Sequence, residues 1–367
     1  MLTPKHDAVE MLGITPLTRT ALDDEFIFSR LLSPTVRAML GPITNVSSPQ
    51  VLDTIAGQFP GDEANNLNDH RLYGGQTGYV RYPYVSQLYS TANGALVLKR
   101  DASKLKLSAW LGDVHQGKGE LIHMAALRDR HHDGTIRAND CALLDFPYDH
   151  PVHHRRIHPT ARSLELSIYS YSPGSRLLDA IGDPVYDEFV AKPFKFVSAD
   201  KTELFLKHFW QVWKSNRSPG QNATSIKDVS KMILPGFYEL AERCRYDFIE
   251  AAPSHYHVAM WMAAAGYRYT HQHDAQTMAQ FASRLKDLRN ADGSELTRSQ
   301  QAWVCVLQNL KQRDAIPKHL DLGGVTWPQD NIGPQTLWVY KPVSALAHEL
   351  AKGQLGVSTP ADSSKKA

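Results

Sequence analysis

The spacing of apolar residues changes along this chain, from every second residue to every third or fourth, and this change limits the folds that it can form. Leu105, Leu107 and Ala109 alternate with polar residues, which is the pattern of a half-buried β-strand. After residue 200 the apolar side chains recur at helical spacing, as at Phe205 and Phe209, so that they share one helix face. The chain therefore combines a sheet-forming region with a helical region.

The sheet-forming region contains several short alternating segments. The same two-residue period is found at residues 96–98, 164–168 and 194–196. Turns rich in glycine, proline and asparagine separate the segments, which favours an antiparallel sheet over β-α-β crossovers. We therefore expect an antiparallel sheet in this part of the chain.

Helices are expected on both sides of the sheet-forming region. Acidic residues 23–25 precede an apolar stretch at 26–32 and suit the first turn of a helix, because they complement its dipole. Pro34 interrupts this pattern, which resumes at 36–40. Further helices are expected at 48–56, 200–213, 225–234, 236–251, 254–265, 271–290, 297–312 and 343–352.

The expected fold class is α+β, with a mixed N-terminal half that holds the antiparallel sheet and a predominantly helical C-terminal half. The expected regions are residues 1–199, which include a His/Arg-rich loop at 115–162, then a helical region at 200–352, and a flexible tail at 353–367. No long flexible linker marks the boundary near residue 199. A single α+β domain is therefore the alternative.

Composition excludes some classes of protein. The longest apolar run, Val258 to Gly266, has nine residues, whereas a membrane-spanning helix needs about 20. The three cysteines, Cys141, Cys244 and Cys305, contain no Cys-x-x-Cys pair, which argues against a disulfide framework and a structural zinc site. We expect reduced, buried thiols, no membrane partner, and a cytoplasmic or other intracellular location, which includes a virion.

Histidine is concentrated in one segment. Eight of the 17 histidines lie between residues 115 and 158, with aspartates between them. Imidazole and carboxylate groups together can bind a divalent metal. The candidate ligands are His131, His150, His154 and His158. Pro151 and Pro159 leave room for barely two helical turns around the last three of these histidines, so a polar surface loop is the simpler interpretation.

The same segment carries the most basic stretch of the chain. Between His150 and Arg162 there are three arginines, Arg155, Arg156 and Arg162, and no acidic residue. Guanidinium groups bind phosphate oxygens through two parallel hydrogen bonds. These three arginines are therefore the candidate contacts to the backbone phosphates of a nucleic acid.

Two His-x-His pairs occur later in the chain, at His255/His257 and His271/His273. Both follow residues that start a helix, and helical geometry would turn the two rings of each pair away from each other. We therefore expect these histidines to pack in the core or at an interface rather than to bind a metal.

No nucleotide-binding loop, nucleophile elbow or other catalytic motif is recognisable. The sequence favours a self-assembling structural protein without a cofactor, of the viral coat, nucleoprotein or intracellular scaffold type. Such a protein would form homo-oligomers and contact nucleic acid, RNA included, through its phosphates. The alternative is a metal-dependent hydrolase, in which the histidine cluster holds a divalent metal and Asp133 or Asp149 orients a water. We expect no enzymatic activity on the first interpretation.

Overall fold

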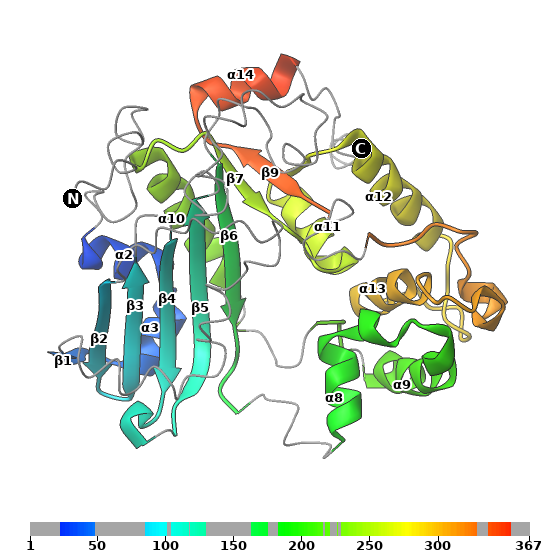
Figure 1. The fold of residues 1–367 in the computed structure, drawn as a ribbon, viewed down its shortest axis with the longest axis horizontal. Helices are drawn as coiled ribbons and strands as arrows, with labels where there is room; N and C mark the ends of the chain where they lie inside the picture. Colours follow the sequence, from blue (N-terminus) through cyan, green and yellow to red (C-terminus); the bar gives the residue numbers. More distant parts are fainter. Residues whose placement is uncertain are drawn as a thin grey trace, which may run out of the picture. The chain divides into compact units, whose positions relative to one another are not determined.

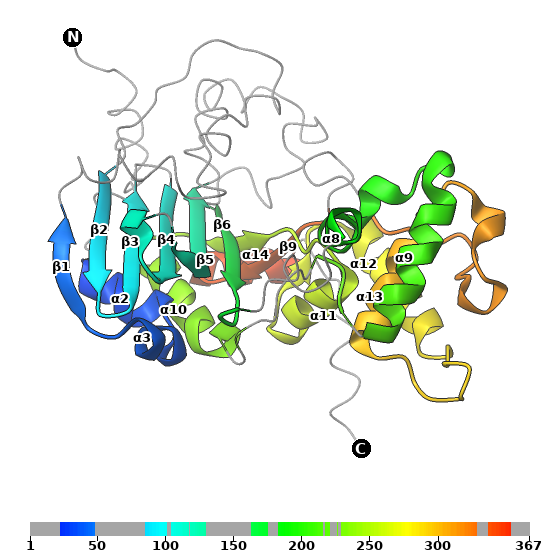
Figure 2. The ribbon, with the colours of Figure 1, turned by 90° about the horizontal axis from the view of Figure 1, so that it is seen from below.

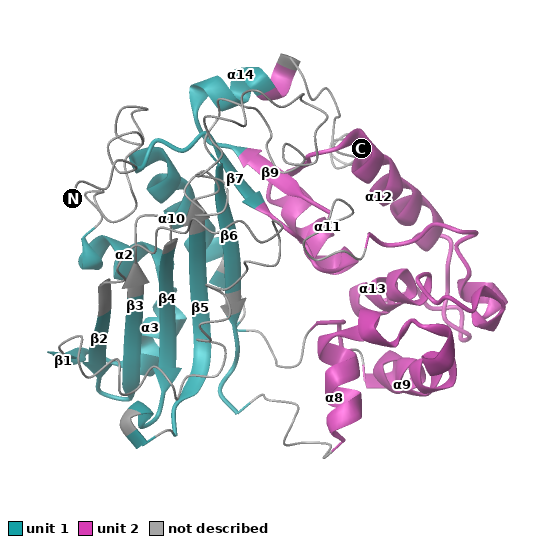
Figure 3. Cartoon of the chain, in the orientation of Figure 1, with its two compact units in different colours: residues 1–174, 225–250, 342–350 teal, residues 175–224, 251–341, 351–367 magenta. Residues whose placement is uncertain are grey.

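A computed structural model of the chain describes residues 23–47, 85–100, 104–116, 118–129, 163–174, 183–215, 217–220, 226, 229–328 and 337–353. The chain forms two compact units, which Figure 3 shows in different colours. Unit 1 comprises residues 1–174, 225–250 and 342–350, and unit 2 comprises residues 175–224, 251–341 and 351–367. Among the described residues, no helix is long and apolar enough to cross a membrane.

Unit 1 is built on a sheet whose strands follow one another in the order β1-β2-β3-β4-β5-β6-β7 (Figure 1). The first six strands pair antiparallel with their neighbours, as the alternating pattern predicts. The seventh pairs parallel to β6. The bounds are β1 (Ile43–Ser47), β2 (Val85–Thr91), β3 (Gly94–Arg100), β4 (Lys104–Leu111), β5 (Glu120–Asp129), β6 (Ser163–Ser170) and β7 (Phe248–Ala251). A 3-10 turn, η3 (Val114–Gln116), lies between β4 and β5.

Apolar side chains are buried on both faces of this sheet. One face carries a cluster of buried residues: Leu88, Ala95, Val97, Trp110 and Val114. The opposite face carries a row of register partners that crosses five strands: Tyr89, Leu96, Ala109, His123 and Ser170. Side chains alternate between faces along a strand, so neighbouring residues of one strand, such as Leu88 and Tyr89, belong to different sets.

Helices α2 (Asp24–Leu31), α3 (Pro34–Leu40) and α10 (Val229–Arg243) lie on one face of this sheet (Figure 2). Helix α2 begins as predicted, because the Asp23 carboxylate accepts a hydrogen bond from the backbone N–H of Phe26 at 2.6 Å. Helix α3 is capped in the same way by the Ser33 hydroxyl. The chain also forms α14 (Ala345–Gly353) close to its end.

Helix α2 is attached both to the sheet and to α10. The Phe28 ring meets the edge of the Tyr89 ring with centroids 4.8 Å apart, and the Tyr89 hydroxyl donates to Asp24. On the other side, Arg30 forms an ion pair with Glu239 of α10 at 3.0 Å. The backbones of the two helices approach so closely that a Cβ atom on Gly236 would lie 2.3 Å from a backbone oxygen of α2. Only glycine fits there.

Unit 2 is mostly helical. Its helices are α8 (Pro184–Ala191), α9 (Thr202–Ser215), α11 (Tyr256–Ala264), α12 (Gln272–Leu285) and α13 (Arg298–Leu307). Two short strands, β8 (Arg268–Tyr269) and β9 (Val339–Pro342), pair antiparallel. Its described residues also form the 3-10 turns η5 (Pro193–Phe196), η6 (Ala199–Lys201), η7 (Arg313–Ala315) and η8 (Lys318–Leu320). In its core, the Phe189 ring stacks on Trp303 with centroids 5.0 Å apart and 7° between the planes.

Two neighbouring side-chain amides hold the irregular segment that follows α13. The side chain of Gln308 donates to the carbonyl of Leu320 and accepts from the N–H of Leu322, both at 2.9 Å. Asn309 does the same with Trp327, donating to its carbonyl at 2.7 Å and accepting from its N–H at 2.9 Å. Both amides are buried, with 0% and 4% of their surface exposed. They satisfy backbone groups that lie outside α-helices and strands.

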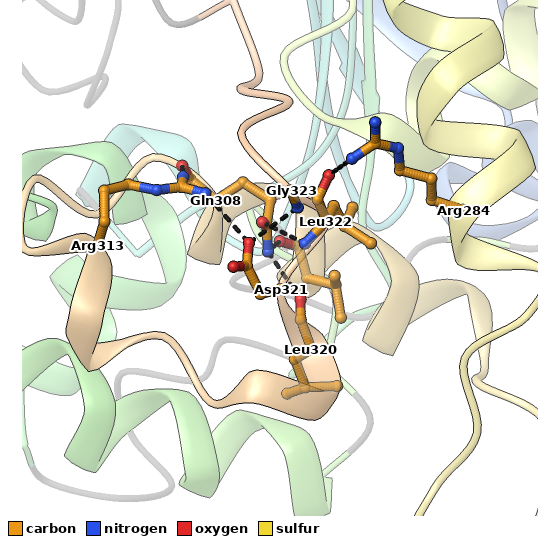
Figure 4. Close-up of polar contacts among 8 residues, drawn as sticks. Arg284, Gln308, Arg313, Leu320, Asp321, Leu322 and Gly323 are labelled. Atoms are coloured by element: carbon orange, nitrogen blue, oxygen red, sulfur yellow. Dashed lines mark hydrogen bonds and ion pairs between the residues drawn. The ribbon is translucent and has the colours of Figure 1, made fainter.

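Charged side chains reinforce this segment from outside (Figure 4). Arg284 of α12 donates to the carbonyl of Leu322. Arg313 contacts the Asp321 carboxylate at 3.1 Å, and the same carboxylate accepts from the N–H of Gly323 at 2.9 Å. The segment is therefore held by side chains rather than by secondary structure.

The structure confirms the α+β class and corrects three local predictions. Residues 194–196 form the 3-10 turn η5 instead of a strand, because Pro193 starts a turn that Lys195 N–H closes on the carbonyl of Lys192. The predicted helices at 225–234 and 236–251 are replaced by the single helix α10, which passes through Pro235, followed by the buried strand β7. The predicted helix at 48–56 lies outside the described residues.

Gln308 offers a direct test of the amide contacts in unit 2. Replacing it with Ala leaves the N–H of Leu322 and the carbonyl of Leu320 buried without their partner, which should lower the free energy of unfolding by about 2 to 4 kcal/mol. Urea unfolding followed by circular dichroism measures this. The control is Gln280→Ala on the exposed side of α12, which should change stability by less than about 0.5 kcal/mol. Equal midpoints for the two variants would show that the amide does not hold the segment.

Candidate functional site

The sheet of unit 1 opens between β6 and β7. The two strands pair only where Ser163–Glu165 lie beside Phe248–Glu250, although β6 continues to Ser170. Figure 1 shows the strands side by side at their start and diverging toward their carboxyl ends. We call the edge of β6 over residues 166–170, on the side of β7, the β6–β7 opening.

The backbone of β6 presents polar groups to this opening. The N–H of Tyr171 donates to the carbonyl of Ile122 at 2.7 Å, so the backbone groups of Tyr171 face β5. Because these directions alternate along an antiparallel strand, the N–H and C=O groups of Leu166, Ile168 and Ser170 face the other way. No described strand pairs with them there, and an edge of this kind can receive a further strand-like group.

The helix that precedes β7, α10, has its N-terminus at the same end of the sheet as the opening. Helix α10 packs against β6 and is joined to β7 by residues 244–247, so it runs antiparallel to β7. Its N-terminus therefore lies on the side of the carboxyl ends of β6 and β7, where ligands bind in sheets with parallel strands. The first turn of α10 contains Lys231 and no acidic residue, and the backbone N–H groups of a first turn attract anions.

Two carboxylates stand where the strands separate. Glu165 of β6 and Glu250 of β7 are register partners, which puts their side chains on the same face. Glu250 is buried, whereas Glu165 is half-buried. Carboxylates at such a position can accept a proton from a bound molecule.

A histidine and a serine are in contact at the end of β6. His123 of β5 and Ser170 of β6 are register partners, and the Nδ1 atom of the ring lies 2.7 Å from the serine Oγ. The other ring nitrogen, Nε2, lies 3.0 Å from the carbonyl of Leu31, the last residue of α2. Burial lowers the pKa of His123 to about 4, and the bond to Leu31 opposes this shift only in part. The ring is therefore neutral near pH 7.

The candidate residues taken from the basic and histidine-rich segment lie outside the described residues. These are Arg155, Arg156 and Arg162 for nucleic acid, and His131, His150, His154 and His158, with Asp133 or Asp149, for a metal. They remain predictions. The part of the chain that the structure describes contains no group of three or more side chains that could hold a metal ion.

In unit 2, His255 is buried and His257 is half-buried, and the two rings do not diverge. The two rings stack with centroids 5.9 Å apart and 20° between their planes. The reason is that His255 is the N-cap of α11 and has extended backbone angles, φ −148° and ψ 159°, so helical geometry does not apply to it. Among the described residues, the pair is not part of any group of three or more side chains that could hold a metal ion.

The second pair is separated by its helix. His271 is the N-cap of α12 and His273 lies in its first turn, where its side chain is exposed. Beside them is the buried carboxyl of Asp274, whose pKa is raised by burial, while the two histidines act in the opposite direction. This pair therefore has the geometry of a helix start rather than of a metal site.

Sequence reasoning did not single out the opening, Ser170 or the contact of His123. The alternating pattern places β6 correctly, but β5 (Glu120–Asp129) forms within residues 115–162, where the sequence predicts a loop, and His123 belongs to this strand. Nothing in the spacing shows that residues 248–250 end beside β6 or that Ser170 faces His123, since these contacts join residues far apart in the chain.

The buried histidines predict a loss of stability in mild acid. Burial lowers the pKa of His257 to about 4 as well. The unfolded chain takes up protons near pH 6.5 and the folded chain does not, so stability should be complete above pH 6.5 and fall as pH decreases toward 4. Each such histidine costs up to about 1.4 kcal/mol per pH unit in that range.

Urea midpoints at intervals between pH 7.5 and 5 measure this dependence before the carboxylates titrate. The matched variant is His123→Gln. It should reduce the dependence of the unfolding free energy on pH by the contribution of one histidine, up to about 1.4 kcal/mol per pH unit. A constant midpoint from pH 7.5 to 5 would contradict the prediction.

Comparison with known proteins identifies no relative for this chain. No family model, no curated protein and no solved structure matches it. The function has to be inferred from the geometry of the described residues.

Proposed function

We propose that the β6–β7 opening binds a coenzyme A thioester and that the chain transfers its acyl group to an acceptor molecule. The observation that carries this proposal is the separation of β7 from β6 after Glu165, which leaves the backbone of three β6 residues facing the opening. A ligand that fits such an edge is extended and carries amide groups, because it has to pair as a strand would.

Coenzyme A has an amide-containing arm that suits the edge of β6 and phosphates that suit the N-terminus of α10. Its arm is an extended chain with two amide groups, which can pair with the backbone of Leu166, Ile168 and Ser170. Its phosphates suit the N-terminus of α10, because backbone N–H groups attract anions there and Lys231 stands in the first turn. A peptide would satisfy the strand edge alone.

The reaction follows from the groups at the carboxyl end of the opening. A thioester transfers its acyl group to an amine or a hydroxyl once that acceptor loses a proton. Glu165 and Glu250 project from the face of the sheet opposite Ser170, so the candidates to accept the proton are His123 and Ser170, which are in contact at the carboxyl end of β6. The acceptor molecule is then bound beside them.

Ile168 provides a specific test of the binding mode. Its N–H faces the opening rather than β5, so Ile168→Pro removes one hydrogen bond to the ligand and none between β5 and β6. Isothermal titration with coenzyme A should show binding to the unaltered chain and affinity about tenfold weaker in Ile168→Pro, since one such bond contributes about 1 to 1.5 kcal/mol.

The control is Ile168→Ala, which shortens the side chain and keeps the N–H. It should retain more of the affinity than Ile168→Pro. Absence of binding to the unaltered chain at millimolar coenzyme A would refute the proposal, and equal affinities for the two variants would refute the strand-like binding mode.

A second candidate function is self-assembly, which is supported by the exposed apolar residues of strand β1. Among the described strands, β1 lies at the edge of the unit 1 sheet. Its residues Ile43 and Val46 are 45% and 53% exposed. An exposed apolar edge strand is a template for pairing with a second chain. On this proposal the chain forms homo-oligomers through β1, as a coat protein, nucleoprotein or scaffold does, and Arg155, Arg156 and Arg162 contact nucleic-acid phosphates.

Light scattering after size-exclusion chromatography tests the assembly proposal. The unaltered chain should form oligomers and Val46→Lys should be monomeric, because a charged residue on an edge strand opposes pairing. Leu346→Lys is the matched control, since Leu346 of α14 is 54% exposed and receives the same charge elsewhere. A monomeric unaltered chain, or equal oligomers in both variants, would exclude assembly through β1.

A further inference from the structure

The contact between His123 and Ser170 has a defined direction of hydrogen bonding. The carbonyl of Leu31 has no hydrogen and can only accept, so Nε2 of His123 carries the proton that it donates. In a neutral ring the other nitrogen, Nδ1, then holds a lone pair. The hydroxyl of Ser170 therefore donates its proton to Nδ1 across 2.7 Å.

This arrangement is that of an activated nucleophile. A hydroxyl donates to an imidazole, and a third group holds the imidazole in the tautomer that can receive the proton. His123 is fully buried, whereas Ser170 is only partly buried, so the serine is the member of the pair that a ligand can reach. Ser170 is also the last residue of β6, beyond the part that pairs with β7.

We infer that Ser170 is a nucleophile that takes the acyl group from a bound thioester, with His123 as its base. This inference rests on the proposed function for the identity of the acyl donor, but not for the reactivity of the serine. It assigns a covalent acyl-serine intermediate to the transfer reaction.

The step balances without any further reactant. The Oγ atom of Ser170 attacks the thioester carbonyl carbon, and its proton moves to Nδ1 of His123. The C–S bond breaks, and the leaving thiolate takes that proton and departs as coenzyme A thiol. An amine or hydroxyl acceptor then attacks the carbonyl carbon of the new ester and gives its proton to Nδ1 of His123. The bond between this carbon and Oγ breaks, and Oγ of Ser170 takes the proton back from His123.

The hydrogen bond to α2 partly offsets the effect of burial, which lowers the pKa of His123. Leu31 is the last residue of α2, and the carbonyl groups at a helix C-terminus carry partial negative charge. An imidazolium formed at His123 during the reaction keeps its hydrogen bond to that carbonyl. The helix end therefore stabilises the ring at the moment when it holds two protons.

A fluorophosphonate probe tests the nucleophile without coenzyme A. The full chain should be labelled at one serine, located at Ser170 by peptide mass spectrometry. Ser170→Ala should abolish this labelling. Ser167→Ala is the control: this residue lies three positions earlier on β6 with its side chain on the opposite face, and its labelling should be unchanged.

A second arm uses acetyl coenzyme A and intact-protein mass. The unaltered chain should gain the mass of one acetyl group, and Ser170→Ala should not. His123→Gln should slow both reactions about 100-fold or more, which is the usual contribution of a general base. If circular dichroism shows that His123→Gln does not fold, the comparison of Ser170→Ala with Ser167→Ala decides the question.

The outcomes separate the two proposals. Binding of coenzyme A without probe labelling of Ser170 would overturn the nucleophile and leave the binding site standing. Probe labelling of Ser170 in a chain that does not bind coenzyme A would support the nucleophile and overturn the acyl donor. Equal labelling of the unaltered chain and Ser170→Ala would overturn the inference.

Discussion

The hydrogen bonds of one buried imidazole join the main parts of unit 1. The ring of His123 connects the end of α2 with β5 and with the last residue of β6, residues that lie 92 and 47 positions away in the chain. A buried polar ring is costly unless both nitrogens have partners, and here both have one. Because both ring nitrogens need hydrogen-bond partners, the tautomer of the histidine is fixed. The same two bonds fix the position of α2 on the sheet and the direction in which the Ser170 hydroxyl points.

The change from antiparallel pairing in β1 to β6 to parallel pairing between β6 and β7 has the largest consequence for the proposed function. A sixth antiparallel pair would have used the whole edge of β6. Instead, β7 arrives from α10 and pairs over three residues, so no described strand pairs with the rest of β6 on that side. An open edge in the interior of a sheet gives a ligand hydrogen-bonding groups that are already ordered, which lowers the entropy lost on binding.

Unit 2 is held by a different principle. After α13 the chain runs through turns without regular secondary structure, and its backbone groups are satisfied by the amides of Gln308 and Asn309. Each amide donates one hydrogen bond to a backbone carbonyl and accepts one from a backbone N–H. In a sheet, the backbone of a neighbouring strand provides the same two bonds. Loops that lack such partners cannot be buried without a large loss of free energy.

Local patterns in the sequence are sufficient to place most of the helices and the strands β3, β4 and β6, because the period of apolar residues and the capping groups act over a few neighbouring residues. Asp23 before α2, Ser33 before α3 and the alternation in β4 and β6 are examples. Short buried segments such as β7 have no period to distinguish a strand from a helix, so the pattern wrongly predicts a helix over residues 248–251. The opening, the Ser170–His123 contact and the stacking of His255 on His257 exist only in the tertiary structure. Each depends on how segments distant in sequence, or backbone angles outside regular elements, place two side chains together.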